Sequence, residues 1–195
     1  REFSSAFGAY NTASGRESSA FGDNNTASGR ESSAFGHLNL ASGKNSLAFG
    51  NQYEVTGETS GAFGVGEHKG NGVYNYINEG NNSYMIGNFN KIASGSNDNF
   101  ILGNKVSIGT GVQNSVVLGN GSASGGSNTV SVGSSSNKRK IVNVADGTAD
   151  SDAATLGQVK NLIASGGSPD LTNDVNKLKT DMTNVKNDVS GLKTD

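Results

Sequence analysis

Hydrophobic residues and glycines recur along this chain at a fixed interval. Phe-Gly pairs begin at positions 7, 21, 35, 49 and 63, and Ser-Gly or Thr-Gly pairs begin at 14, 28, 42 and 56, so both marks repeat every 14 residues. The first mark continues with aliphatic residues in place of Phe, at Ile86, Leu102, Leu118 and Val132. Nine marks in register predict a repeat architecture, because a flexible glycine linker would not hold Phe on a regular spacing.

A 14-residue unit is long enough for two short strands and two tight turns, which together make one coil of a parallel β-solenoid. A repeat built from a helix pair needs more than about 30 residues, so that class is excluded. We expect the glycine of each mark to take a positive φ at a turn. The pattern therefore predicts an all-β solenoid or roll of 14-residue coils over residues 1–137.

The later repeats are apolar at successive strand positions, as in 100–102 and 116–118. Successive strand residues point to opposite faces of a sheet, so both faces of these strands must be buried. One face fills the interior of the coil, whereas the other needs a partner that no segment of the repeat region is left to supply. We infer that several copies of the chain pack together through this outer face.

One step of the repeat is longer than the others. Phe63 and Ile86 are 23 residues apart, nine more than a regular coil, which places an insertion at about 65–83. Insertions in solenoids map to surface loops and often to a binding face. We expect candidate ligand-binding residues there, while an open alternative is that the Tyr rings only pack over neighbouring coils; the candidates are His68, Lys69, Tyr74 and Tyr76.

The composition changes after the last repeat. Residues 138–165 begin with three basic residues, and the composition of 141–145, Ile-Val-Asn-Val-Ala, predicts a strand. Residues 150–152, Asp-Ser-Asp, are candidate N-caps for a short helix and would place acidic groups near its first turn. Its apolar positions fall three and four residues apart, at Leu156, Val159 and Ile163.

Residues 166–195 carry a heptad pattern that predicts a parallel α-helical coiled coil. The apolar core positions step by four and three residues without error, at Leu171, Val175, Leu178, Met182, Val185, Val189 and Leu192. In a parallel coil, a g residue faces the e residue five positions later on the next chain. That rule pairs Asp174 with Lys179, Asp181 with Lys186, and Asp188 with Lys193. Val at a with Leu at d favours two strands, so the coil by itself does not specify a trimer.

Composition excludes several functions. The chain has 29 Gly, 1 Pro and no Cys, and its net charge is −2, so it offers no disulfide, no thiolate site and no basic surface for nucleic acid. No apolar run is long enough to span a membrane as a helix, and because no apolar h-region lies near Arg1, we expect no signal peptide within these residues. Only His37 and His68 are present, each without a second ligand at metal spacing. We expect no enzyme activity, catalytic residue, cofactor or metal.

The repeats of the form Ser-x-Ala-Phe-Gly and x-Ala-Ser-Gly resemble the head of YadA-like trimeric autotransporter adhesins. The stretches 140–147 and 152–159 resemble the neck of that family, although 152–155 and 158–159 depart from its usual residues, and a heptad stalk follows in the family's order. The resemblance implies a left-handed parallel β-roll head at 1–137, a neck at 138–165 that exchanges between chains, and a stalk at 166–195, all in a homotrimer.

The same resemblance implies a function. It implies a virulence-related adhesin, exposed on the bacterial cell surface, that attaches to host extracellular-matrix proteins, epithelial cells or other bacteria. It also implies an outer-membrane anchor domain that would lie outside this chain. A phage tail fibre or another structural trimer is the alternative from a different class.

Overall fold

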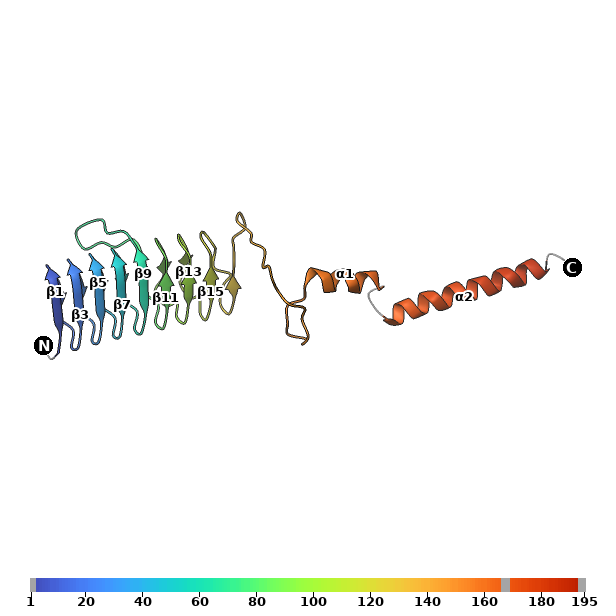
Figure 1. Cartoon of the computed structure of the whole chain (residues 1–195), viewed down its shortest axis with the longest axis horizontal. Coiled ribbons are helices and arrows are strands. Elements are labelled where there is room, and N and C mark those ends of the chain that lie inside the picture. The colour runs from blue at the N-terminus through green and yellow to red at the C-terminus, as the bar shows by residue number, and fades with distance from the viewer. Residues whose placement is uncertain (1–2, 166–168, 193–195) are drawn as a thin grey trace. The chain divides into compact units, whose positions relative to one another are not determined.

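The computed structural model describes residues 3–165 and 169–192 and divides the chain into two compact units, Arg1–Arg139 and Lys140–Asp195. The first unit is a parallel β-solenoid whose coils stack from β1 at its N-terminal end to β16 (Figure 1). The predicted solenoid is therefore confirmed, with about nine coils.

Each of the first seven coils contributes one strand to each of two parallel sheets, and the last two coils contribute a strand to the first sheet only. The nine-stranded sheet consists of β1 (Ser5–Ala9), β3 (Ser19–Asp23), β5 (Ser33–His37), β7 (Leu47–Asn51), β9 (Gly61–Val65), β11 (Tyr84–Ile86), β13 (Phe100–Leu102), β15 (Val116–Leu118) and β16 (Val130–Ser131). The seven-stranded sheet consists of β2 (Thr12–Ala13), β4 (Thr26–Ala27), β6 (Leu40–Ala41), β8 (Glu54–Val55), β10 (Ile77–Asn78), β12 (Lys91–Ile92) and β14 (Ser107–Ile108). The strands of the second sheet have only two residues, because a turn begins directly after them.

The interior of the solenoid widens toward its C-terminal end. In the 14-residue coils, both sheets place a fully buried Ala inside, such as Ala20 and Ala27. In the coils that are 16 residues apart, the inward residues are Met85, Ile92 and Ile101. The two extra residues lengthen the coil, and larger side chains occupy its interior.

A ladder of asparagines runs through the interior beside the Ala columns. Asn25 is fully buried; its amide donates to the carbonyls of Phe21 and Gly36, and its oxygen accepts from the backbone N–H of Asn39. Asn39 in turn accepts from the backbone N–H of Tyr53. Because each amide satisfies backbone groups of two coils, these polar residues stabilise the stack instead of destabilising its core.

Tyr53 replaces Asn in this ladder next to the insertion. Its ring is fully buried, and its hydroxyl donates to the Gly87 carbonyl at 2.8 Å and accepts from the Asn90 N–H at 3.1 Å. Burial raises the pKa of Tyr53 to about 12. The long side chain thus crosses the level of the inserted coil and joins the ladder on its far side.

The two glycine marks have different structural reasons. The glycine after Phe takes positive φ as predicted, for example 117° at Gly22. The prediction is wrong for the glycine after Ser: the left-handed residue of that turn is two positions later, such as Glu17 or Glu31, each at φ 58°. Gly29 is needed for space, because a Cβ there would lie 2.0 Å from the carbonyl oxygen of Gly43 in the next coil.

The second unit contains two helices, α1 (Leu156–Ala164) and α2 (Pro169–Leu192). The predicted strand at 141–145 is absent, and its apolar side chains are exposed, including Ile141 and Val142. A strand needs a neighbouring strand for its backbone hydrogen bonds, and within the described residues of this unit none lies beside it.

Candidate functional site

The outer side of the nine-stranded sheet carries a continuous apolar row. In-register pairing places one large apolar residue of every coil beside the next. Neighbouring Phe rings contact along the row, with centroids 5.1 to 6.2 Å apart. The row consists of Phe7, Phe21, Phe35, Phe49, Phe63, Ile86, Leu102 and Leu118.

This row is exposed or half-buried in the single chain, and none of its residues is fully buried. The exposed fraction is 52% for Phe49 and 49% for Leu102, although both residues lie in the middle of the sheet. Beside the row, the position two residues earlier is Ser19 in an early coil but Phe100 and Val116 in later coils. The apolar surface therefore broadens toward the C-terminal coils, and a contiguous exposed patch of this kind is typical of a protein interface.

The insertion forms a short hairpin that leaves the roll after β9. The chain departs at Gly66, whose N–H donates to the Asn51 carbonyl, and His68 pairs with Tyr74 in an antiparallel bridge. The Lys69 N–H donates to the Val73 carbonyl across the tip. The chain rejoins the roll at Asn75, whose N–H donates to the carbonyl of Glu67. The insertion is therefore an ordered structure held by its own backbone hydrogen bonds.

The structure separates the four candidate residues of the insertion into two groups. His68 and Tyr74 pack on each other, with ring centroids 4.7 Å apart, while Lys69 is exposed toward the tip. Tyr76 lies beyond the hairpin and packs on Phe89, with centroids 5.4 Å apart. The three rings are half-buried, so each combines packing against a neighbouring ring with partial exposure.

Two ionisable groups beside the hairpin are shifted by their surroundings. Burial, followed by the negative charge of Glu54, raises the pKa of Tyr74. Burial, followed by the charge of Glu79, raises the pKa of Glu54. Both effects favour the neutral forms of these side chains.

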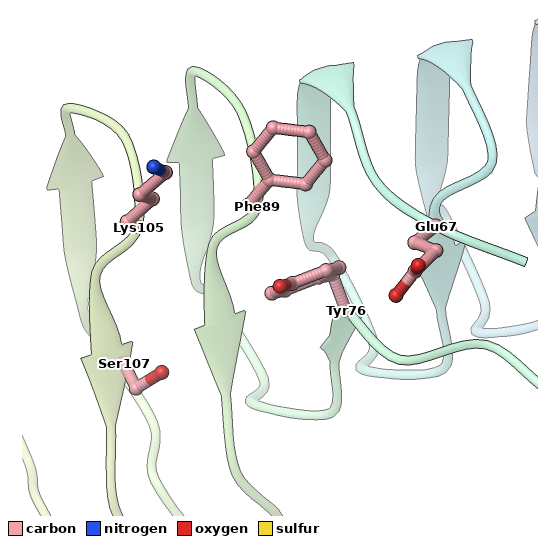
Figure 2. A pocket seen from close by; sticks show the side chains of 5 residues that line it. All are labelled: Glu67, Tyr76, Phe89, Lys105 and Ser107. Carbon is pink, nitrogen blue, oxygen red and sulfur yellow. The ribbon is translucent and has the colours of Figure 1, made fainter.

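A groove of about 410 Å³ lies beside the base of the hairpin (Figure 2). Its lining residues are Glu67, Tyr76, Phe89, Lys105 and Ser107. The sequence indicated only Tyr76, because Phe89 and Lys105 belong to the two following coils. Both of these occupy the corner after a long strand, at φ 58° and 56°, where regular coils carry Asn24 or Gln52. An aromatic residue and a lysine at this corner position in the two coils that follow the insertion are the sequence signal that would have located the groove.

The segment before α1 is organised by side-chain hydrogen bonds. Thr155 is the N-cap of α1 and forms a capping box with Gln158, so the predicted caps at 150–152 are wrong. Asp152 instead accepts from the N–H groups of Thr148 and Ala149, which lowers the pKa of its carboxyl group. Gln158 lies three residues after Thr155, and the reciprocal hydrogen bonds between these two residues make Thr155 the N-cap.

Helix α2 displays the predicted apolar seam along one face. All seven core positions named from the heptads lie in α2, and all are exposed in the single chain, from 42% at Val175 to 78% at Leu192. The acidic and basic residues assigned to the interchain pairs also lie in α2, except Lys193, which lies outside the described residues.

Among residues 3–165 and 169–192, no group of three or more His, Cys, Asp or Glu side chains could hold a metal ion. Within the same ranges, neither helix is long and apolar enough to cross a membrane.

Comparison with known families identifies the repeats of the roll. Residues 2–25 and 27–52 match the YadA head domain repeat in two copies. The first coils of the roll are similar to YadA head repeats. The predicted resemblance to the YadA head is thus confirmed for these two repeats, and the matched coils are the ones in which both glycine marks are most regular.

Two further comparisons were made with the whole chain. A search of curated proteins finds no match. The solved structures similar to this chain include the crystal structure of the collagen-binding domain of the Yersinia adhesin YadA, at 20% identity and a TM-score of 0.46. That similarity covers 80% of this chain and 86% of the Yersinia domain.

Proposed function

We propose that this chain is the head, neck and first part of the stalk of a bacterial surface adhesin that works as a homotrimer. The head is 1–137, the neck 138–165 and the stalk 166–195. The observation that carries the proposal is the partly exposed apolar row on a roll whose first coils match YadA head repeats. A large apolar surface of this kind is stable in water only when other subunits cover it.

Three separate parts of the chain expose apolar residues that need partners. The head has the row around Leu102, the neck has Ile141 and Val142, and α2 has the seam around Leu178. Identical chains arranged around one axis would cover all three parts at once, because each part would meet its own copies. This agreement supports assembly of identical chains along the whole length, and the YadA-like repeats favour three chains over two.

The proposed targets are host extracellular-matrix proteins, epithelial cells or other bacterial surfaces. Three identical heads held together present three copies of every binding site, so weak individual contacts add through avidity. We place the head outside the bacterial cell, with attachment to the outer membrane through an anchor domain outside these residues. We further propose that the hairpin contributes to binding, since it places Lys69 and the Tyr74 ring beyond the regular coils.

The experiment that tests this proposal combines mass measurement with an attachment assay. The purified chain should have the mass of three copies in solution, and the trimer should bind to at least one member of an array of matrix proteins, epithelial cells and bacteria. A trimer that attaches to none of these surfaces contradicts the adhesin function.

A hairpin deletion tests the contribution of the insertion. Removing residues 66–74 restores the regular 14-residue spacing, so the roll should still fold. We expect attachment to fall at least tenfold while the trimer mass is unchanged. Val73→Ser, an exposed substitution at the hairpin tip, is the matched control for the loss of apolar surface alone. Unchanged attachment by a folded deletion trimer excludes the hairpin from the binding surface.

A further inference from the structure

The groove at the base of the hairpin exists because one corner of the roll is missing. In the coils before it, the chain turns after each long strand through a residue with positive φ, such as Leu38 or Gln52. In the inserted coil the chain leaves the roll at Gly66 instead, and returns at Asn75. The rings of Tyr76 and Phe89 therefore lack a neighbouring corner on that side, and the groove opens beside them.

Polar groups surround this aromatic pair and have few partners within the protein. In Figure 2, Tyr76 lies between Glu67 on one side and Phe89, Lys105 and Ser107 on the other. Among the described residues, the Lys105 ammonium, the Tyr76 hydroxyl and the Ser107 hydroxyl form no hydrogen bond or ion pair. The Glu67 carboxylate accepts from the Asn75 amide through one oxygen, which leaves its second oxygen uncommitted within that part of the chain.

We propose that this groove binds a saccharide ring that carries an anionic group, either a carboxylate or a sulfate. The C–H face of such a ring would pack on Tyr76 and Phe89, as apolar surface packs on aromatic rings. Its anionic group would form a charge-assisted hydrogen bond with Lys105. Its hydroxyls would donate to Glu67 and exchange hydrogen bonds with Ser107, so each uncommitted polar group gains a partner.

The geometry favours a compact ligand over a peptide strand. A peptide binds to a sheet by adding to a free strand edge. Here β11 is already paired with β9 and β13, and β12 with β10 and β14, so no edge is free beside the groove. The groove has opposite charges at its two ends, Glu67 and Lys105, and its volume lies near the lower limit for small-molecule sites, about 300 Å³.

This inference rests on the proposed surface function, because acidic saccharides reach the head only if it is exposed outside the cell. The test uses the whole chain with three defined probes: 3′-sialyllactose, lactose 3′-sulfate and lactose. Binding is measured by isothermal titration calorimetry at two salt concentrations. We expect at least one anionic probe to bind at least tenfold more tightly than lactose, and more weakly at high salt, because an exposed charge pair is screened. Which anionic probe binds distinguishes the carboxylate from the sulfate.

Two variants locate the binding. Lys105→Gln removes the cation of the groove, and we expect about tenfold weaker binding of the anionic probe together with a loss of its salt dependence. Lys44→Gln is the matched control, since Lys44 is also an exposed lysine on the roll but does not line the groove. Tyr76→Ala should weaken the probe as well, and circular dichroism melting shows whether that variant remains folded.

Several results would overturn the inference. They are equal binding of lactose and the anionic probes, full binding by Lys105→Gln, and no binding of any probe at millimolar concentration. The attachment assay separates this outcome from a failure of the adhesin function. A trimer that attaches to cells or matrix proteins equally well with Lys105→Gln, and binds no saccharide, retains the proposed function and loses only this assignment.

Discussion

Tyr53 shows how a single residue keeps the interior of the roll continuous past the insertion. Its hydroxyl supplies hydrogen bonds to Gly87 and Asn90 that the regular Asn ladder would otherwise provide. Tyr53→Phe keeps the ring but leaves that carbonyl and that N–H without a partner. We expect a loss of about 1 to 3 kcal/mol in the free energy of unfolding, measured with urea. A variant as stable as the parent would mean that these backbone groups find other partners.

The same residue gives the roll a dependence on alkaline pH. Burial raises the pKa of Tyr53 to about 12, above the ordinary value of 10.0, so the folded chain holds this proton at a higher pH than the unfolded chain. The stability due to the neutral phenol is complete below pH 10 and is lost as the pH rises from 10 toward 12. The slope is at most about 1.4 kcal/mol per pH unit. Urea unfolding at pH 9, 10 and 11 should show a shallower decline for Tyr53→Phe, and identical slopes would contradict this origin.

Substitutions at two glycines can test whether the roll needs glycine because neighbouring coils approach closely or because glycine is flexible. An added Cβ at Gly29 would lie 2.0 Å from a carbonyl oxygen of the next coil, whereas at Gly109 it would meet nothing within 4 Å. We therefore expect Gly29→Ala to destabilise the head by about 2 to 3 kcal/mol through overpacking, with Gly109→Ala close to the parent. Thermal melting of the two variants checks this, and equal melting temperatures would show that the coils can separate to admit a methyl group.

At the scale of elements, the charged residues of helix α2 predict that neighbouring chains of the proposed coiled coil run parallel. If Asp181 and Asp188 face lysines of a neighbouring parallel chain, Asp181→Lys with Asp188→Lys places like charges at both contacts. We expect roughly 1 kcal/mol of lost stability per chain at low salt, and less at high salt. The measurement is the thermal melting of the stalk at two salt concentrations.

A charge exchange serves as the control for that variant. Adding Lys186→Asp to Asp181→Lys restores one complementary pair with reversed polarity, so it should recover part of the lost stability. No recovery, or no effect of the original reversal, would contradict the parallel pairing.

At the scale of the whole molecule, the apolar row of the roll predicts that copies of the chain assemble through the outer face of the nine-stranded sheet. Leu102→Asp places a charge in the middle of the outer face, where burial against other copies would cost several kcal/mol. We expect the chains to dissociate into monomers, or the three rolls to come apart while the coiled coil still holds the chains together. Solution mass detects the first result, and small-angle scattering detects the second. Thr26→Asp, on the outer side of the other sheet, should leave the mass unchanged. A monomeric parent chain, or an unaffected Leu102→Asp trimer, would contradict this use of the row.

Some elements of this chain follow from local sequence patterns, and others depend on contacts that those patterns do not show. The Phe row was predictable because equivalent residues of successive repeats lie next to each other in a solenoid. The helix α1 was found from its apolar spacing, but its cap was not, because Asp152 and Thr155 are both good N-caps and only the reciprocal bond from Gln158 distinguishes them. The strand at 141–145 failed since its apolar pattern lacks a pairing strand in the described chain.

The solenoid, the place of the insertion and the C-terminal helix can be predicted from the sequence alone, because each follows from a spacing between residues close along the chain. The folded structure is needed to see that a Cβ at Gly29 would collide with a carbonyl oxygen one coil away, and that the Tyr53 hydroxyl bonds to Asn90, 37 positions later. It also brought Glu67, Tyr76 and Lys105 to one groove. These contacts join residues of different coils, and they depend on the stacking of those coils and on the corner that the insertion replaces. Spacing between residues close along the chain does not show either feature.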